Sequence, residues 1–219
     1  MPLSLCLIMA LVFALKPPAV HAIDFARLRA TLVLRFGPDR LPVLEQWQKT
    51  LSEINGLEDL AKLHRINTFI NDNTRFLDDE QVWQQKDYWA TPLQLIGRGQ
   101  GDCEDLAIAK YYSLKNAGIE IAKLRLVYVR AQINQSGKLQ TQAHMILAYY
   151  SSPLSEPLVL DNLVADIRPA SQRNDLQPVF SFNHEALWSG VANDGPSSNG
   201  KQLTRWEDLQ MRAAEEGMD

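Results

Sequence analysis

The sequence predicts an α+β protein in which N-terminal helices precede an antiparallel sheet, with a helix that carries a cysteine between the two parts. Three observations lead to this expectation. From residue 23 to about 86, apolar residues recur every three or four positions, which is the period of an amphipathic helix. A glycine-rich segment, 97–101, then leads into an unbroken apolar run that ends near Gly118. After Gly118 the apolar period changes to two, as in strands that cover a core with one face.

The first 22 residues are predicted to be a signal peptide. Residues 3–15 are almost wholly apolar, which is too short a run to span a membrane, and Ala22 follows small or medium residues as at a signal-peptidase site. A short uncleaved anchor is the alternative. Cys6 lies in this segment, so the exported chain would keep Cys103 as its one thiol, without an intramolecular disulfide partner.

Three helices are expected between residues 23 and 86. The first ends at Gly37, which is followed by a proline, and the second ends near residues 55–56. The third runs from about 57 to 70, and turn-forming residues at 71–75 close it. His64 lies within the third helix with no acid or thiol near it in sequence, so we interpret it as a surface or packing residue.

The central helix is expected to begin at about Asp102 and to stop at Gly118. Cys103 then lies in the first turn, where unpaired backbone N–H groups and the positive end of the helix dipole favour a thiolate. Gly101 would let another chain approach the sulfur closely. The alternative is a small buried hydrophobic residue, which is what most free cysteines are.

Acidic residues surround this cysteine. Their negative charge raises the pKa of a neighbouring thiol, and three of them exceed what capping of a helix requires. A hard cation such as Ca²⁺ would neutralise the site, because carboxylate oxygens are its preferred ligands. The sequence therefore predicts calcium bound by Asp102, Glu104 and Asp105, with Asp87 as a further ligand.

Strands are expected over residues 124–130, 141–150, 158–160 and 177–182, with a hairpin turn at 134–137. Antiparallel neighbours can place His144 beside Asp161. A thiolate needs a base that takes and returns its proton, and the imidazole needs a group that fixes its tautomer. We therefore predict a triad of Cys103, His144 and Asp161. Each partner alone has a simpler explanation: a packing histidine in a half-buried strand, and a turn residue before Asn162.

The domain is predicted to span residues 23–190, and residues 191–219 are predicted to form a linker and a short C-terminal helix. The linker is rich in Asn, Gly, Pro and Ser, and Thr204 opens a capping-box pattern. The 219 residues have 46% hydrophobic content, as in ordinary globular proteins. The net charge of −4 gives no electrostatic reason to expect nucleic acid as a partner.

Residues 101–111 (GDCEDLAIAKY), 143–147 (AHMIL) and 160–162 (LDN) resemble the bacterial transglutaminase-like cysteine proteinases. The resemblance covers about residues 57–182. It implies a papain-like or transglutaminase-like fold whose nucleophile helix packs on an antiparallel sheet. It also implies Cys103 as nucleophile, His144 as general base and acid, Asp161 as its orienting group, and calcium at the acidic residues around Cys103.

The resemblance further implies a periplasmic protease that cleaves a large surface adhesin near the adhesin's N-terminus, beside paired alanines, and so disperses biofilm. The periplasmic domain of an inner-membrane cyclic di-GMP receptor would hold such a protease. Two rival functions remain at this point: acyl transfer to an amine, as in a transglutaminase, and a catalytically silent binding module that uses the same groove.

Overall fold

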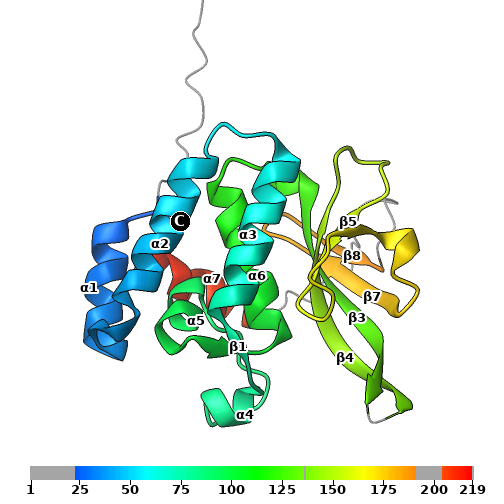
Figure 1. Cartoon of the computed structure of the whole chain (residues 1–219), viewed down its shortest axis with the longest axis horizontal. Helices are drawn as coiled ribbons and strands as arrows, with labels where there is room; N and C mark the ends of the chain where they lie inside the picture. Colours follow the sequence, from blue (N-terminus) through cyan, green and yellow to red (C-terminus); the bar gives the residue numbers. More distant parts are fainter. Residues whose placement is uncertain (1–22, 136, 191–203, 219) are drawn as a thin grey trace, which may run out of the picture.

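The computed structural model describes residues 23–135, 137–190 and 204–218. Helices form one half of the molecule and a twisted antiparallel sheet forms the other (Figure 1). The predicted signal peptide and the predicted linker at 191–203 lie outside the described residues. Within the described ranges, none of the helices has the length and apolar character that a membrane span requires.

The helical half begins with the three helices that the sequence predicts. They are α1 (Phe25–Phe36), α2 (Leu41–Ile54, after a 3₁₀ turn at Pro38–Arg40) and α3 (Asp59–Asn73). The third begins two residues later than expected, and Leu57 and Leu60 are exposed rather than buried. Trp47 of α2 is fully buried and donates a hydrogen bond from Nε1 to Ser113 Oγ (2.9 Å), which ties this half to the central helix.

The central helix, α6 (Cys103–Asn116), is buried almost throughout and packs between α3 and strand β4. Between α3 and α6 the chain forms α4 (Asp79–Val82), α5 (Pro92–Arg98) and a parallel pair of short strands, β1 (Arg75–Phe76) and β2 (Gln100–Gly101). A Cβ at Gly101 would lie 2.6 Å from Asp105 Oδ2 and from Leu95 Cδ1. Only glycine therefore fits at the entrance to α6.

The sheet has six strands in the order β6-β5-β4-β3-β7-β8, and all neighbours are antiparallel. The strands are β3 (Leu124–Gln135), β4 (Lys138–Tyr149), β5 (Leu158–Leu160), β6 (Arg168–Pro169), β7 (Leu176–Phe182) and β8 (Leu187–Ser189). The predicted hairpin is confirmed, and its two strands are longer than expected. One face of the sheet packs on α6, and the other carries a smaller apolar cluster that includes Val127, Ile146 and Val159.

The predicted C-terminal helix is present as α7 (Thr204–Glu216), and it packs into the main core through Trp206, Leu209 and Ala213. Its Glu216 is buried, accepts a hydrogen bond from Thr91 Oγ1 (2.5 Å) and pairs with Arg35 (2.8 Å). The helix is therefore part of the same packed body as residues 23–190.

Candidate active site

A cleft of about 500 Å³ opens between the N-terminus of α6 and the β3–β4 hairpin. Cys103 and Glu104 line it from the helix, and His144 lines it from β4. Phe76 and Leu163 line it from the β1 segment and from the loop after β5. The structure therefore brings the predicted thiol and the predicted imidazole into one cavity, although 41 positions separate them in the sequence (144 − 103).

The Cys103 sulfur lies among negative charges. Its thiol donates a hydrogen bond to Glu104 Oε2 (2.8 Å). Burial raises the pKa of this thiol well above its usual value, and the charge and hydrogen bond of Glu104 and the charge of Asp102 raise it further. A hydrogen bond from the backbone N–H of Met145 lowers the pKa in part. With its pKa raised in this way, the sulfur is held as a thiol.

On the sheet side, His144 and Asp161 form a buried hydrogen-bonded pair. His144 Nε2 lies 2.7 Å from Asp161 Oδ1, and both side chains are almost completely buried. Because Nε2 is engaged by the carboxylate, Nδ1 is the ring nitrogen that remains for the cleft. The predicted contact between these two residues is thus present, with Asp161 directly after β5 and His144 on β4.

A cation that sequence reasoning missed completes this pair. Arg173 Nη2 donates to Asp161 Oδ2 (2.7 Å), and the backbone N–H groups of Asn162 and Leu163 donate to Asp161 Oδ1 (2.7 and 3.2 Å). Although burial opposes ionisation, the hydrogen bonds and charges of His144 and Arg173 lower the pKa of Asp161 to about 2. Asp161 is therefore a fixed anion at neutral pH.

The acidic residues near α6 form two overlapping groups. Asp102 and Glu104 lie with Cys103, and Asp79 lies with Asp102 and Asp105, with one ligand atom of each residue within 4.8 Å of the others in its group. Asp79, in the short helix α4, was missed because no local pattern marks it as a partner of α6. Glu104 thus faces the sulfur, whereas Asp105 points into the protein.

The second group is short of positive charge. One oxygen each of Asp79, Asp102 and Asp105 is buried without a hydrogen-bond partner among the described residues. Burial and mutual repulsion raise the pKa of Asp79 to about 6, that of Asp102 to about 10 and that of Asp105 well above its usual value. Unpaired, converging carboxylate oxygens match the donor set that Ca²⁺ prefers, so the residues present fit a calcium ion.

The loop at residues 88–90 supports these carboxylates from behind. The backbone N–H of Tyr88 donates to Asp79 Oδ2 (2.5 Å), and that of Ala90 donates to Asp105 Oδ1 (2.7 Å). Arg212 of α7 holds the same loop, because it donates to Trp89 O (2.7 Å) and to Tyr88 Oη (3.0 Å). The C-terminal helix is thereby connected to the acidic group through one loop.

Asp87, the fourth predicted calcium ligand, occupies a different position. Its carboxylate pairs with Arg205 of α7 (2.6 Å) and is about half exposed. Among the described residues, the carboxylate that joins Asp102 and Asp105 is Asp79. A role for Asp87 as a ligand stays a prediction.

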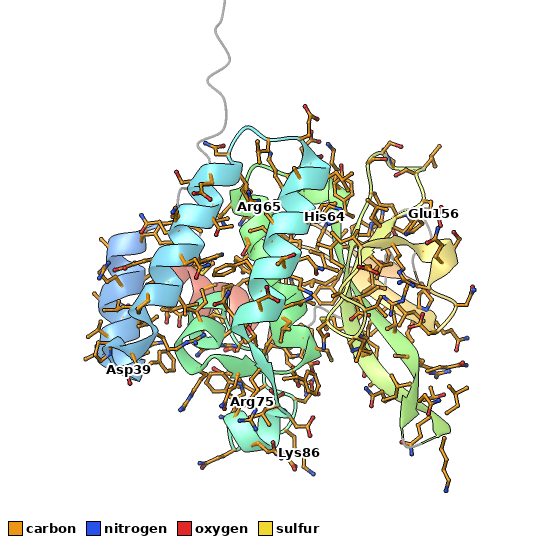
Figure 2. All side chains as sticks on the ribbon, in the orientation of Figure 1. Asp39, His64, Arg65, Arg75, Lys86 and Glu156 are labelled. Carbon is orange, nitrogen blue, oxygen red and sulfur yellow. The ribbon has the colours of Figure 1, made fainter. Side chains whose placement is uncertain are left out.

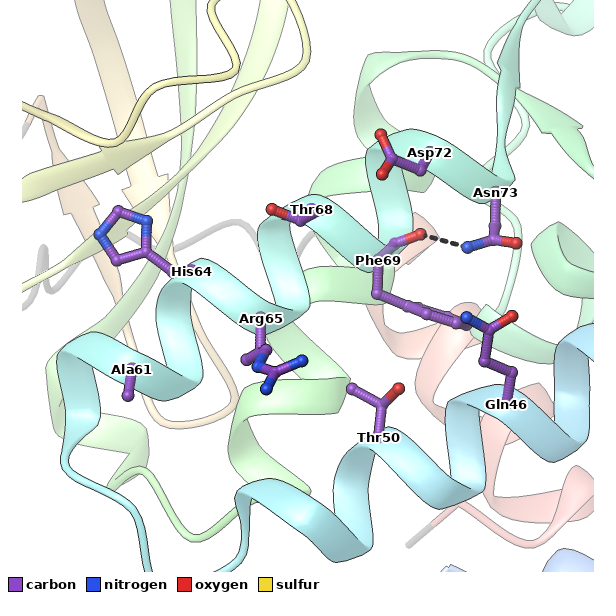
Figure 3. Close-up of a pocket in the computed structure, with 9 residues that line it drawn as sticks. All are labelled: Gln46, Thr50, Ala61, His64, Arg65, Thr68, Phe69, Asp72 and Asn73. Carbon is purple, nitrogen blue, oxygen red and sulfur yellow. Dashed lines mark hydrogen bonds between the residues drawn. The ribbon is translucent and has the colours of Figure 1, made fainter.

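A second hollow, of about 550 Å³, lies between α2 and α3. Figure 3 shows its polar lining, with Gln46 and Thr50 from α2 facing Arg65 and Phe69 from α3. His64 is exposed and lines its far end, and in Figure 2 it lies on the side of α3 nearer the sheet, whereas Arg65 lies on the side nearer α2. No thiol lines this hollow. His64 is therefore an exposed residue away from the thiol, as its sequence context predicts.

The model of the family of bacterial transglutaminase-like cysteine proteinases matches residues 46–190. This is about two thirds of the chain, and the chain therefore belongs to that family. A comparison with curated protein sequences finds no match.

Among solved structures, the fold is similar to that of LapG from Legionella pneumophila. The two chains are 32% identical, the match covers 87% of this chain and 98% of the Legionella chain, and the TM-score is 0.72. EGTA-treated and calcium-bound forms of the same Legionella protein match with TM-scores of 0.74 and 0.72. The protein is thus a LapG-like cysteine protease with a transglutaminase-like fold.

Proposed function

We propose that this protein is a calcium-dependent endopeptidase of the periplasm that cleaves a large surface adhesin near its N-terminus and so releases the adhesin and disperses biofilm. Control by the periplasmic domain of an inner-membrane cyclic di-GMP receptor is part of the proposal. The observation that carries the catalytic part is one cleft that joins a helix-N-terminal thiol to a buried imidazole–carboxylate pair. The likeness to Legionella LapG, which has a calcium-bound form, supports the protease class and the calcium dependence, whereas the adhesin, the periplasm and the receptor are proposed from the family resemblance.

In the proposed mechanism, Cys103 is the nucleophile. His144 takes the proton of its thiol, and the sulfur attacks the carbonyl carbon of the scissile peptide bond. Backbone N–H groups in the first turn of α6 have no intrahelical partner and can stabilise the oxyanion. His144 then gives its proton to the leaving amine, which leaves an acyl group on the sulfur.

The second half of the reaction uses the same groups. His144 removes a proton from water, the resulting hydroxide attacks the thioester, and the sulfur leaves as a thiolate. Asp161, held by Arg173, stabilises the imidazolium in both halves and keeps the ring oriented. Removal of one oxyanion donor in sites of this kind costs roughly 10²–10³ in rate.

Asp79, Asp102, Glu104 and Asp105 would hold the calcium ion. The ion would supply the positive charge that these carboxylates lack, and this charge favours the thiolate form of Cys103. Glu104 would connect the calcium ion to the nucleophile, because its carboxylate also accepts the hydrogen bond of the Cys103 thiol.

The test is a gel assay with purified protein and an N-terminal fragment of a large surface adhesin from the same genome. The lanes contain wild type with calcium, wild type with EGTA, and Cys103→Ala with calcium. We expect cleavage only in the first lane, and a Cys103→Ala variant that keeps the wild-type fold by circular dichroism. Cleavage by folded Cys103→Ala would contradict the assignment of the nucleophile.

A labelled amine in the same reaction separates hydrolysis from acyl transfer. Water and an amine compete for the same thioester, so a transferase would attach the label to the substrate. We expect two unlabelled fragments. Labelled substrate of full length would replace the peptidase proposal by the transferase alternative.

A further inference from the structure

One edge of strand β4 is open next to the cleft. Strand β5 pairs with β4 only at positions 147–149, whereas β3 pairs with it along its whole length. Within the part of the chain that the structure describes, no strand covers the other edge of β4 from Lys138 to Ile146. Residues 138–143 are exposed, and Figure 1 shows the β3–β4 hairpin extending beyond the helical half.

The backbone groups on this edge can be assigned from one hydrogen bond. Tyr150 donates its backbone N–H to Lys123 O (2.8 Å), so its backbone groups point toward β3; Met145, five residues earlier in the same register, points away from β3. In an antiparallel pair of regular register, every second residue directs its N–H and C=O to the same side, and the β3–β4 register is regular throughout. Thr141 and Ala143 therefore direct their backbone groups outward on the same edge as Met145.

This edge leads directly into the cleft. Gln142 and Ala143 line the cleft together with Cys103 and His144. By the rise of a strand, the outward groups of Ala143 and Thr141 lie about 7 and about 14 Å from Met145, which follows the cleft residue His144. Unpaired N–H and C=O groups are thus spaced along the path that a peptide would follow to the nucleophile.

Two large apolar side chains stand in the same cleft. Phe76 is 48% exposed and Leu163 is 41% exposed. Such residues gain free energy when a ligand covers them, and here they lie where the side chains of a bound peptide would project.

We propose that the substrate binds as an added β-strand on the open edge of β4, with backbone pairing at Ala143 and Thr141 and with a small or apolar side chain against Phe76 and Leu163. This inference rests on the proposed peptidase function and names the kind of substrate that it takes. The cleaved segment is extended and locally unfolded, because only an extended backbone can pair with a strand edge. A bond inside a stable helix is not cleaved.

Proline variants test the backbone pairing, because proline lacks the N–H and is tolerated on a strand edge where that group faces solvent. Ala143→Pro is expected to lower kcat/KM by about tenfold, the larger effect of losing one hydrogen bond, and Thr141→Pro by a smaller factor. Leu139→Pro is the matched control, because Leu139 directs its backbone groups to the same edge of β4 but lies about 20 Å from Met145. This variant should change kcat/KM less than twofold. The substrate is the adhesin fragment of the gel assay.

Two further readouts separate binding from damage to the fold. Alkylation of Cys103 by iodoacetamide and the affinity for calcium involve no added strand, so both should match wild type in Ala143→Pro. Equal kcat/KM for Ala143→Pro and Leu139→Pro overturns the proposal.

N-methylation of the substrate tests the same backbone pairing without any mutation of the protein. The probe is a twelve-residue peptide centred on the bond that is cleaved in the adhesin fragment, methylated at one backbone nitrogen at a time. Strand pairing predicts that cleavage is lost at every second position, and a uniform or absent effect overturns it. If wild type cleaves neither fragment nor peptide, the peptidase proposal fails together with this inference, whereas cleavage without the period of two removes this inference alone.

Discussion

The two sides of the active site differ in how their carboxylates are paired. The sheet wall consists of His144 with the buried Asp161 and Arg173, and the helix wall consists of Cys103 and Glu104 with Asp79, Asp102 and Asp105. On the sheet wall, the carboxylate of Asp161 is saturated by His144, Arg173 and two backbone N–H groups, and its pKa falls to about 2. On the helix wall, Asp79 and Asp102 each bury an oxygen without a partner among the described residues, and their pKa values rise to about 6 and about 10. An aspartate is thus readily ionised on the sheet wall, whereas the ionised form of an aspartate is disfavoured on the helix wall.

This difference indicates which wall depends on an added ion. On the sheet wall, protein groups alone hydrogen-bond both oxygens of Asp161, so the imidazole–carboxylate pair should keep its geometry with and without calcium. The helix wall combines unpaired anions with a thiol of raised pKa, and a bound cation corrects both features at once. Calcium should therefore act on the thiol and on stability, and it should leave the imidazole–carboxylate pair unchanged.

The largest effect is expected on the sheet wall. Asp161→Asn removes the anion that orients His144 and stabilises its charged form, so the rate of cleavage should fall by roughly 10²–10⁴. Asp175→Asn is the matched control, because Asp175 also pairs with Arg173 but is partly exposed. Steady-state kinetics on the adhesin fragment measures both variants. Equal losses in the two variants would show that Arg173, rather than the contact with His144, determines the effect.

The next effect concerns the helix wall. Asp79→Asn removes one of the converging carboxylates and should weaken calcium binding by about 10- to 100-fold, while it stabilises the metal-free protein by relieving repulsion. Glu80→Gln is the control, because this neighbour is exposed and pairs with Lys86. Isothermal titration calorimetry with calcium measures both. Wild-type affinity in Asp79→Asn would remove Asp79 from the ligand set.

A change of pH should separate the two walls without mutation. In the folded metal-free protein the pKa of Asp79 is raised from 3.8 to about 6, so its contribution to stability is present below about pH 4 and is lost as the pH rises through about 6. The pKa of Asp161 is lowered to about 2, so its contribution is present above about pH 4 and is lost only as the pH falls toward 2.

The melting temperature of EGTA-treated protein should therefore decrease as the pH rises from about 4, most steeply up to about pH 6, where Asp79 and Asp102 both contribute. Calcium at 100 times its dissociation constant adds about 2.7 kcal/mol, or roughly 5–10 °C for a chain of this size, and its effect should be larger at pH 7 than at pH 4. Calorimetry across this range provides the data. A calcium-induced shift of the same size at both values would contradict the titration of the helix wall.

The smallest effect is expected from the C-terminal helix. Arg212→Leu removes the donor that holds the loop at residues 88–90, so calcium affinity should fall by about three- to tenfold and the melting temperature by a few degrees. Asp208→Asn removes only the exposed partner of Arg212 and should have little effect on either quantity. An unchanged calcium affinity in Arg212→Leu would mean that α7 stabilises the core alone.

Local patterns were sufficient to predict the elements that carry the cleft. The glycine-rich segment and the apolar run predicted α6 with Cys103 in its first turn, and the change to a period of two predicted the hairpin with His144. The family resemblance added the fold that joins them. These features depend on residues that are near each other in sequence, where helix and strand periods apply directly.

Contacts between distant segments could not be predicted in this way. Asp79 belongs to a four-residue helix whose role depends on how the loop after α3 packs, and Arg173 lies in a loop twelve residues after Asp161. Asp87 was predicted to reach a cation near Asp102; it pairs with Arg205, a contact that the sequence did not indicate, and its role as a ligand stays a prediction. In each case the position is determined by tertiary packing, which leaves no periodic signal in the sequence.

The most direct test of the account is a calcium titration of metal-free protein in which binding and cleavage are measured on the same sample. Calorimetry gives the binding curve, and the initial rate on the adhesin fragment gives the activity curve. We predict saturable binding and a cleavage rate that rises from near zero with the same midpoint. Full cleavage in the metal-free protein, or binding that leaves the rate unchanged, would contradict the dependence of the thiol on a cation at the helix wall.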